Sequence, residues 1–212
     1  MKHYAVIGFP IEHSRSPRLH QAAFGLLDMD DCHFEALEIK PEDLGSWIKN
    51  DFRKFYQGAA ITVPHKIEAL KYIDVPTDSA IKIGAINTLY WLEDKVIGTN
   101  TDSVGALKAV ESVMNDVENK KVLILGAGGA ARSIIFALNF AGMKVAVWNR
   151  TSQKAQALAQ EFEVGYLDAL TPEAFDLFDL IVNTTPVGLK KWESLVPADY
   201  WSPHQVAFDV VY

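Results

Sequence analysis

The stretch KVLILGAGGAARSIIFALNF, residues 121–140, decides the fold of the second half of the chain. Its first five residues read as an apolar strand, and the residues after Gly129 carry apolar side chains at helical spacing to about Phe140. The turn between them, GAGGAA, places small residues in the spacing G-x-G-x-x-G/A. A strand that enters a helix through such a turn is typical of the first unit of a doubly wound, dinucleotide-binding sheet.

Each small residue of this turn has a physical role in such a site. Gly126 permits the tight turn, Gly128 lets the backbone approach a pyrophosphate, and Ala131 keeps the helix close to the strand. The helix N-terminus presents free N–H groups and a positive dipole end to the phosphates. A bare strand-to-helix turn would not require three small residues at these spacings. The cofactor-binding residues expected in the loop are Gly126, Ala127, Gly128, Gly129 and Ala130.

The next strand indicates which dinucleotide binds. NAD sites tend to place Asp or Glu about 20 residues beyond the glycine loop, where the carboxylate accepts the ribose 2′-hydroxyl. Here the strand ends in Asn149, Arg150 and Thr151, with Lys154 one turn into the following helix. A guanidinium can pair bidentately with a 2′-phosphate, which a carboxylate would repel. The sequence therefore favours NADP over NAD, and Thr151 is also expected to cap the helix.

The rest of the chain alternates strands and helices, which predicts an α/β fold. A front domain with a mostly parallel sheet should precede a Rossmann-like, doubly wound domain. Only four or five strands are counted in the latter, where about six are usual, so we expect it to be incomplete and the natural protein to continue beyond Tyr212. The expected parts are a substrate-binding and catalytic domain over residues 1–102, a connecting helix and linker over 103–119, and an NADP-binding domain over 120–212.

Composition excludes several classes of function. The chain is 49% hydrophobic and 22% charged, with a net charge of −7 and no block of Lys or Arg, so nucleic acid and anionic membranes are poor partners. No apolar run approaches the roughly 18 residues of a membrane span, and Pro10 comes too early for a secretory signal, which predicts a cytoplasmic protein. The six histidines lack metal-ligand spacing, so no metal is expected. The single cysteine, Cys32, reads as a small buried strand residue.

Polar clusters stand at element ends of the front domain, where α/β proteins form ligand crevices. Ser16 and Asp102 also read as N-caps of the helices that follow them. Lys66 is expected in the first turn of a helix, where the positive dipole end disfavours its charged form and would lower its pKa toward the range useful for proton transfer. Asp102 could orient this lysine. The clusters are residues 13–17, 62–66, 87–88 and 100–102.

The order of these motifs resembles the shikimate dehydrogenase family over essentially the whole chain. The opening GFPIEHSRSPRLH is similar to the family's G-x-P-I-x-H-S-x-S-P-x-x-H, and GAAITVPHK to its G-x-N-V-T-x-P-x-K. The motifs that follow in family order are GAINT, GTNTDSVG, GAGGAAR, NRT, NTTPVGL and a closing D-x-x-Y. Eight ordered motifs are a far more specific signal than any one of them.

The resemblance implies an NADP-dependent oxidoreductase that reversibly reduces 3-dehydroshikimate to shikimate, in the biosynthesis of aromatic amino acids. It implies Lys66 and Asp102 as the catalytic pair, Val210 near the nicotinamide and Asp78 facing the cofactor, and a monomer or homodimer with a small-molecule substrate. The residues implied to contact the substrate are Ser14, Ser16, Thr62, Asn87 and Asp102, with Tyr212 beside them.

One residue departs from the family pattern and leaves alternatives open. Ala60 stands where the family usually has Asn; if the missing amide reached the substrate, its loss would weaken binding by roughly 1 to 3 kcal/mol. A quinate/shikimate dehydrogenase that uses NAD is the nearest alternative, and Arg150 argues against it. The other alternative is a catalytically impaired paralogue or fragment with a binding or regulatory role. Ala60 and the short chain end favour this alternative, whereas Lys66 argues against it.

Overall fold

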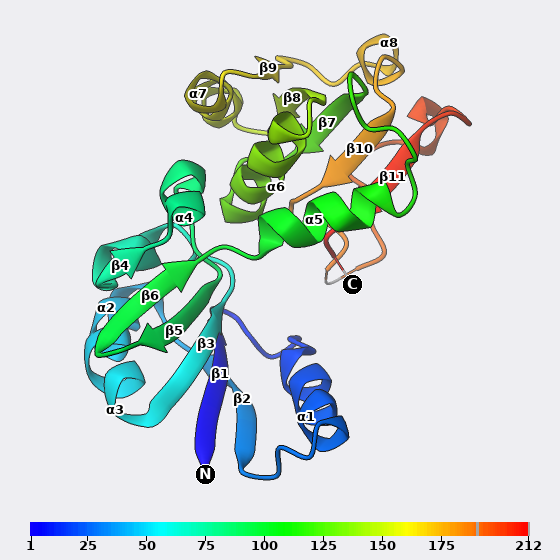
Figure 1. The fold of residues 1–212 in the computed structure, drawn as a ribbon. Coiled ribbons are helices and arrows are strands. Elements are labelled where there is room, and N and C mark those ends of the chain that lie inside the picture. Colours follow the sequence, from blue (N-terminus) through cyan, green and yellow to red (C-terminus); the bar gives the residue numbers. More distant parts are fainter. Residues whose placement is uncertain (190, 212) are drawn as a thin grey trace. The chain divides into compact units, whose positions relative to one another are not determined.

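The computed structural model describes residues 1–189 and 191–211 and divides the chain into two compact units, Met1–Thr101 and Asp102–Tyr212 (Figure 1). Each unit has its own sheet and its own hydrophobic core.

The first unit is built on a six-stranded mixed sheet in the order β2-β1-β3-β5-β6-β4. The two flanking strands pair with β1 in parallel, as expected for the predicted mostly parallel sheet, and β5 pairs with both of its neighbours antiparallel. In chain order the elements are β1 (Lys2–Gly8), α1 (Ser16–Leu26), β2 (Cys32–Glu38), α2 (Leu44–Ser46), α3 (Arg53–Phe55), β3 (Tyr56–Ile61), β4 (Val75–Pro76), α4 (Asp78–Ile83), β5 (Thr88–Leu92) and β6 (Lys95–Thr99).

Because successive side chains of a strand point to opposite faces of the sheet, one face carries the core of the first unit and the other carries a smaller hydrophobic cluster. Ala5 and Ile7 of β1 belong to the larger cluster, whereas Val6 packs on the opposite face with Phe34. Cys32 is buried, as predicted. The sequence after β2 predicts a single helix over residues 42–50, but residues 41–55 form a succession of short 3-10, α and π segments.

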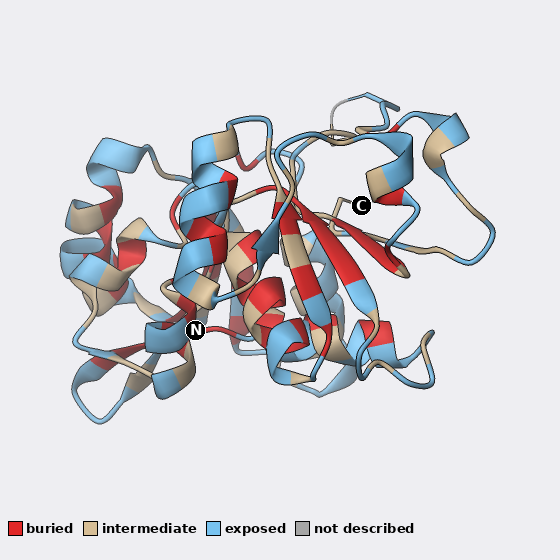
Figure 2. Cartoon of the chain, turned by 90° about the horizontal axis from the view of Figure 1, so that it is seen from above, coloured by how far each residue is buried: buried red, intermediate tan, exposed pale blue. Residues whose placement is uncertain are grey.

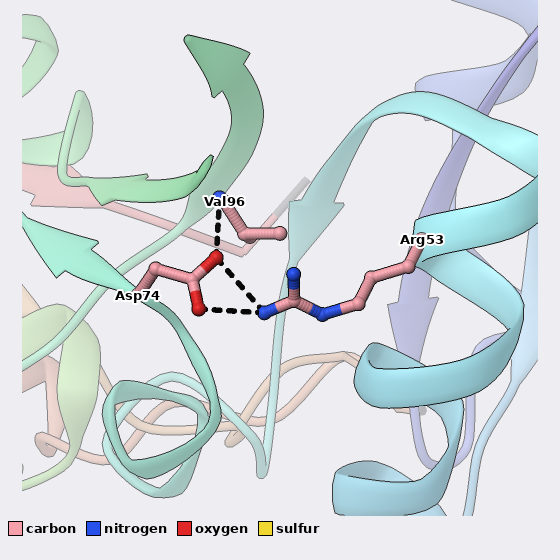
Figure 3. A network of polar contacts seen from close by, with 3 residues as sticks. All are labelled: Arg53, Asp74 and Val96. Carbon is pink, nitrogen blue, oxygen red and sulfur yellow. Dashed lines mark hydrogen bonds and ion pairs between the residues drawn. The ribbon is translucent and has the colours of Figure 1, made fainter. Parts of the chain in front are cut away.

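An ion-pair network ties three segments of the first unit together (Figure 3). Asp74, just before β4, accepts two hydrogen bonds from the Arg53 guanidinium of α3, at 2.8 and 2.9 Å. Its carboxylate also accepts from the backbone N–H of Val96 in β6 at 2.7 Å. The Arg53 hydrogen bonds, followed by the Val96 N–H, lower the pKa of the Asp74 carboxyl below its usual range. This carboxylate therefore fixes the short edge strand β4 against the sheet.

The second unit is built on a five-stranded parallel sheet in the order β11-β10-β7-β8-β9. This is the order 5-4-1-2-3 of a doubly wound Rossmann-like sheet, which confirms the predicted fold class. In chain order the elements are α5 (Asp102–Glu111), β7 (Lys121–Leu125), α6 (Gly129–Phe140), β8 (Lys144–Trp148), α7 (Ser152–Phe162), β9 (Gly165–Tyr166), α8 (Pro172–Phe175), β10 (Leu180–Asn183) and β11 (Val206–Asp209).

Strand β7 is buried on both faces, which explains its continuous apolar sequence. Val122 and Ile124 pack in the core shared with α6 and α7, whereas Leu123 and Leu125 pack with Phe175 on the other face. Figure 2 shows that many residues of the strands are buried, whereas most helices have buried residues along one side only. Helix α5 contributes to the same core through residues 106 and 110, which lie in the segment expected as a connection.

Candidate active site

The glycine loop joins β7 to α6 as the sequence predicted. Helix α6 begins at Gly129, with Gly128 in the N-cap position in an extended conformation. Ala131 is completely buried in the core beside Val122 and Ile124, so its small side chain does keep the helix close to the strand. The first turn of a 12-residue helix therefore opens directly at the carboxyl end of the central strand.

Gly126 and Gly128 are required for different reasons. Gly126 has φ +119°, which disfavours any other residue, and a Cβ there would collide with Thr184 Oγ1. A Cβ at Gly128 would meet no heavy atom of the described chain within 4 Å. The turn itself thus demands glycine at 126, whereas the space beside Gly128 is open at the helix N-terminus, where a phosphate oxygen would bind.

The loop after β10 supports the glycine loop, a role that the NTTP motif did not reveal from sequence. The Thr184 hydroxyl donates to the backbone carbonyl of Leu125 at 2.8 Å, across 59 residues of sequence. The Asn183 amide donates to Asp209 Oδ1 at 3.0 Å, and its carbonyl oxygen accepts from the Thr185 hydroxyl at 2.7 Å. The carboxyl ends of β7, β10 and β11 are therefore joined by side-chain hydrogen bonds.

The predicted 2′-phosphate residues follow β8, next to the glycine loop. Gly126 N–H donates to the Trp148 carbonyl at 2.8 Å, which places the end of β8 beside the loop. Arg150 and Lys154 are both exposed, so their charges are available to a ligand. Thr151 occupies the N-cap position of α7, but its side chain makes no capping hydrogen bond. The predicted side-chain cap is therefore wrong.

Two of the predicted substrate residues, Thr62 and Asn87, lie with the predicted catalytic residue Lys66 at one edge of the first unit's sheet. Ile61 N–H donates to the Asn87 carbonyl at 2.7 Å, which joins the end of β3 to the segment before β5. Ile86 N–H donates to the Lys66 carbonyl at 2.8 Å. Thr62 directly follows Ile61, so the backbone hydrogen bonds bring residues 62, 66 and 87 to the same edge.

The amide of Asn87 is oriented by Thr101, which belongs to the polar cluster of residues 100–102 but received no role of its own from the sequence. Its Nδ2 donates to Thr101 Oγ1 at 2.9 Å, and its Oδ1 accepts from Thr101 N–H at 2.9 Å. The Thr88 hydroxyl also donates to Asn87 Oδ1 at 2.9 Å. Three contacts on one side chain fix its direction, as a residue that must read a hydroxyl pattern requires.

The serine pair follows β1 at the same edge and corrects a prediction. Helix α1 begins at Ser16, and Arg15, not Ser16, stands at the N-cap position. The cap-like contact comes from Ser14, whose Oγ accepts from Ser16 N–H at 3.4 Å. Ser14 N–H in turn donates to the Ile11 carbonyl at 2.9 Å, and Ile11 is buried. Ser14 therefore takes the capping role that the sequence assigned to its neighbour.

The predicted helical position of Lys66 is also wrong. Lys66 lies in a turn, two residues before a five-residue 3-10 helix that begins at Glu68. A helix dipole needs aligned peptide units behind the residue, and a single short 3-10 segment supplies few of them. The argument that a helix dipole tunes Lys66 therefore fails, and its position at the sheet edge is what remains.

The other predicted residues occupy element ends. Asp102 is the first residue of α5 and is half-buried, and its predicted role as a cap stays a prediction. Asp78 opens α4 and is exposed, and Val210 follows β11, where its N–H donates to the Asn183 carbonyl at 3.1 Å. Tyr212 lies outside the described residues.

Ala60 lies on β3 directly opposite Thr88 of β5, on the same strand face as Thr62. It is half-buried and packs against the cluster of Val6, Ile11 and Phe34. Its effect on substrate affinity stays a prediction.

Among residues 1–189 and 191–211, no group of three or more His, Cys, Asp or Glu side chains could hold a metal ion. Within the same part of the chain, no helix has the length and apolar character needed to span a membrane.

Comparison with known proteins covers both units. A family model described as the shikimate dehydrogenase substrate binding domain matches residues 6–89, and one described as shikimate / quinate 5-dehydrogenase matches residues 108–186. The shikimate dehydrogenase (NADP(+)) of Methanococcoides burtonii is 41% identical over 214 residues, which cover 100% of this chain and 78% of that protein.

Solved structures give the same result. Shikimate 5-dehydrogenase of Thermus thermophilus, in complex with NADP(H) and shikimate, is similar with a TM-score of 0.90 and 38% identity, over 100% of this chain and 79% of that one. Shikimate dehydrogenase of Aquifex aeolicus has a TM-score of 0.93 and 39% identity, over 100% of this chain and 79% of that one.

Proposed function

The chain belongs to the shikimate dehydrogenase family, and from this premise we propose that it is an NADP-dependent oxidoreductase that reversibly reduces 3-dehydroshikimate to shikimate. The observation that carries the proposal is the convergence of Thr62, Lys66 and Asn87 at one sheet edge of the first unit. A hydroxyl-rich carboxylate needs several fixed donors and acceptors together with a cation, and this edge supplies them.

The second unit fits a dinucleotide. Open space beside Gly128, the N-terminus of α6 and the carboxyl end of the central strand supply what a pyrophosphate needs. Arg150 and Lys154 supply charge for a 2′-phosphate, which supports NADP over NAD. When bound, NADPH supplies the hydride. We assign cofactor contacts to residues 126–130, 149–151 and 154 and to Val210, with Asp78 as a further candidate.

The side chains of this chain would handle the proton and orient the substrate. Reduction of a ketone to an alcohol requires one proton at the new hydroxyl oxygen, in addition to the hydride at carbon. We assign this transfer to Lys66 with Asp102, because an ammonium can donate and a carboxylate can orient it. Substrate contacts are assigned to Ser14, Ser16, Thr62, Asn87 and Asp102, and to Tyr212.

Initial rates would test this function. Shikimate and quinate are each oxidised with NADP and with NAD, while the absorbance of the reduced nicotinamide is followed. We expect the highest kcat/KM for shikimate with NADP. A higher kcat/KM with NAD, or with quinate, would instead support the quinate/shikimate alternative.

A calorimetric titration separates the remaining alternative. If no pair of substrate and cofactor turns over while shikimate still binds, the chain is a binding protein on an enzyme scaffold. If shikimate neither turns over nor binds, the proposed function is wrong.

We further propose that the protein acts in the cytoplasm as a monomer or homodimer, without nucleic acid or membrane.

A further inference from the structure

His65 is the most deeply buried polar side chain at the sheet edge that carries the candidate substrate residues. Only 1% of its surface is exposed. Its Nε2 lies 2.7 Å from the backbone carbonyl of Ile39, which follows β2. Because a carbonyl oxygen can only accept, Nε2 must carry the proton and donate. Burial lowers the pKa of His65, which favours the neutral ring.

This contact joins the ends of three strands. Ile39 N–H donates to the Gly8 carbonyl at the end of β1, at 3.1 Å. Phe9 N–H donates to the Val63 carbonyl after β3, at 3.0 Å. The imidazole therefore closes a loop of hydrogen bonds that runs from β3 to β2, on to β1 and back to β3.

The same contact fixes the turn that presents the candidate substrate residues. His65 N–H donates to the Thr62 carbonyl at 3.0 Å, so the turn begins at Thr62. On its other side, the Lys66 carbonyl accepts from Ile86 N–H at 2.8 Å. Thr62 N–H also donates to the Ile7 carbonyl at 2.9 Å, so the imidazole adds a side-chain tether to a turn whose backbone is bonded at several points.

The packing around the turn is tight. A Cβ on Gly8 would lie 2.6 Å from Thr62 Cγ2 and 3.0 Å from the Val63 carbonyl oxygen. The backbone of Gly8 therefore lies close against Thr62 and Val63, and a small shift of this turn would alter its packing on β1.

We propose that His65 is a positioning residue, whose hydrogen bond to Ile39 holds the turn of residues 62–66 in the conformation that directs Thr62 and Lys66 at the substrate. The inference rests on the proposed function of that turn. It does not make His65 a group that touches the substrate.

The test compares His65→Leu, which removes the donor, with His65→Gln, whose amide can reach the same carbonyl. The matched control is Trp91→Phe, which removes another side-chain N–H that donates to a backbone carbonyl in this unit, that of Tyr56 at 2.9 Å. Steady-state rates are measured with shikimate and NADP, together with hydrogen exchange at the Ile86 amide. If His65→Leu fails to fold, His65→Asn replaces it, because its amide is too short to reach Ile39.

We expect His65→Leu to lower kcat about 10- to 100-fold, as displacement of reacting groups by about 1 Å does. The KM for shikimate should rise while the KM for NADP stays within about two-fold, because the glycine loop belongs to the other unit. Simple loss of folded protein would lower the apparent kcat and leave both KM values unchanged. His65→Gln should recover most of the rate, and Trp91→Phe should alter neither kcat nor KM.

Unchanged kinetics in folded His65→Leu, or an equal loss in Trp91→Phe, would overturn the proposal. If the unsubstituted chain has no turnover, the proposed function fails separately, and the Ile86 amide decides the inference. Faster exchange at Ile86 in His65→Leu but not in Trp91→Phe supports it. Equal exchange in all variants contradicts it.

Discussion

The two units build their candidate sites in opposite ways. In the first unit, side chains at the sheet edge are fixed by hydrogen bonds, as Thr101 fixes Asn87 and His65 fixes the turn before Lys66. In the second, the backbone is left bare, with open space beside Gly128 at a helix N-terminus. The first arrangement should therefore fail when a side chain is removed, and the second when one is added.

Removal of Lys66 should give the largest effect. We expect Lys66→Ala to lower kcat by about 10²- to 10⁴-fold, because a positioned proton donor contributes that much to a hydride transfer. The matched control is Lys71→Ala, which removes an exposed lysine that pairs with Glu68 on the same short helix. Turnover that survives in Lys66→Ala would remove the lysine from the proposed chemistry.

Removal of Arg150 probes a place where the second unit is proposed to contact its ligand through a side chain. Arg150→Ala should weaken NADP binding about 10- to 100-fold, since a hydrogen bond to a charged group contributes about 1.5 to 3 kcal/mol. NAD binding should be unchanged, because NAD lacks the 2′-phosphate. Lys144→Ala, at the opposite end of the same strand β8, serves as control. Equal losses for NADP and NAD would place Arg150 elsewhere than at the 2′-phosphate.

Addition of one carbon to the glycine loop tests the bare backbone directly. Gly128→Ala should leave the melting temperature unchanged or slightly raised, because the new Cβ meets no neighbour. Affinity for NADP, measured by calorimetry, should fall about tenfold, or about 1.4 kcal/mol. Gly126→Ala should have a larger effect on stability than on affinity: its melting temperature should fall, because the added Cβ introduces backbone strain of about 1 to 3 kcal/mol. Full NADP affinity in Gly128→Ala would contradict the idea that a ligand occupies this space.

The smallest effect concerns the scaffold of the first unit. Because the Arg53 hydrogen bonds lower the pKa of Asp74 in the folded state, this pair stabilises the fold above the unfolded pKa of about 4. That contribution is lost as the pH falls through the lower, folded pKa. Asp74 is 36% exposed, so the contribution should be about 1 kcal/mol or less. Urea denaturation should show that Asp74→Asn loses this part of the acid sensitivity; an unchanged slope of stability with pH would contradict it.

Regular periodicity made the second unit predictable from sequence. The alternation of buried strands and amphipathic helices gave β7, α6 and the order of the parallel sheet, because those patterns depend on neighbours along the chain.

The errors fall where distant residues decide the local structure. His65 bonds to a carbonyl 26 residues away, and the turn that this produces excludes the helix that was predicted around Lys66. Thr184 supports the glycine loop from 59 residues away. The predicted cap at Ser16 failed because α1 already begins at Ser16, whose N–H donates to Ser14 Oγ. Side-chain hydrogen bonds of this kind leave no periodic signal in the sequence.

The open position at Gly128 has a consequence for protein engineering. Replacement of a glycine by alanine in an extended conformation commonly raises stability by about 0.4 to 1 kcal/mol, because the unfolded chain loses freedom. A directed-evolution experiment that selects only for heat resistance should therefore accumulate alanine at residue 128. Such a library would become more robust while it loses its ligand, so any thermostability screen of this protein needs a parallel screen for dinucleotide binding.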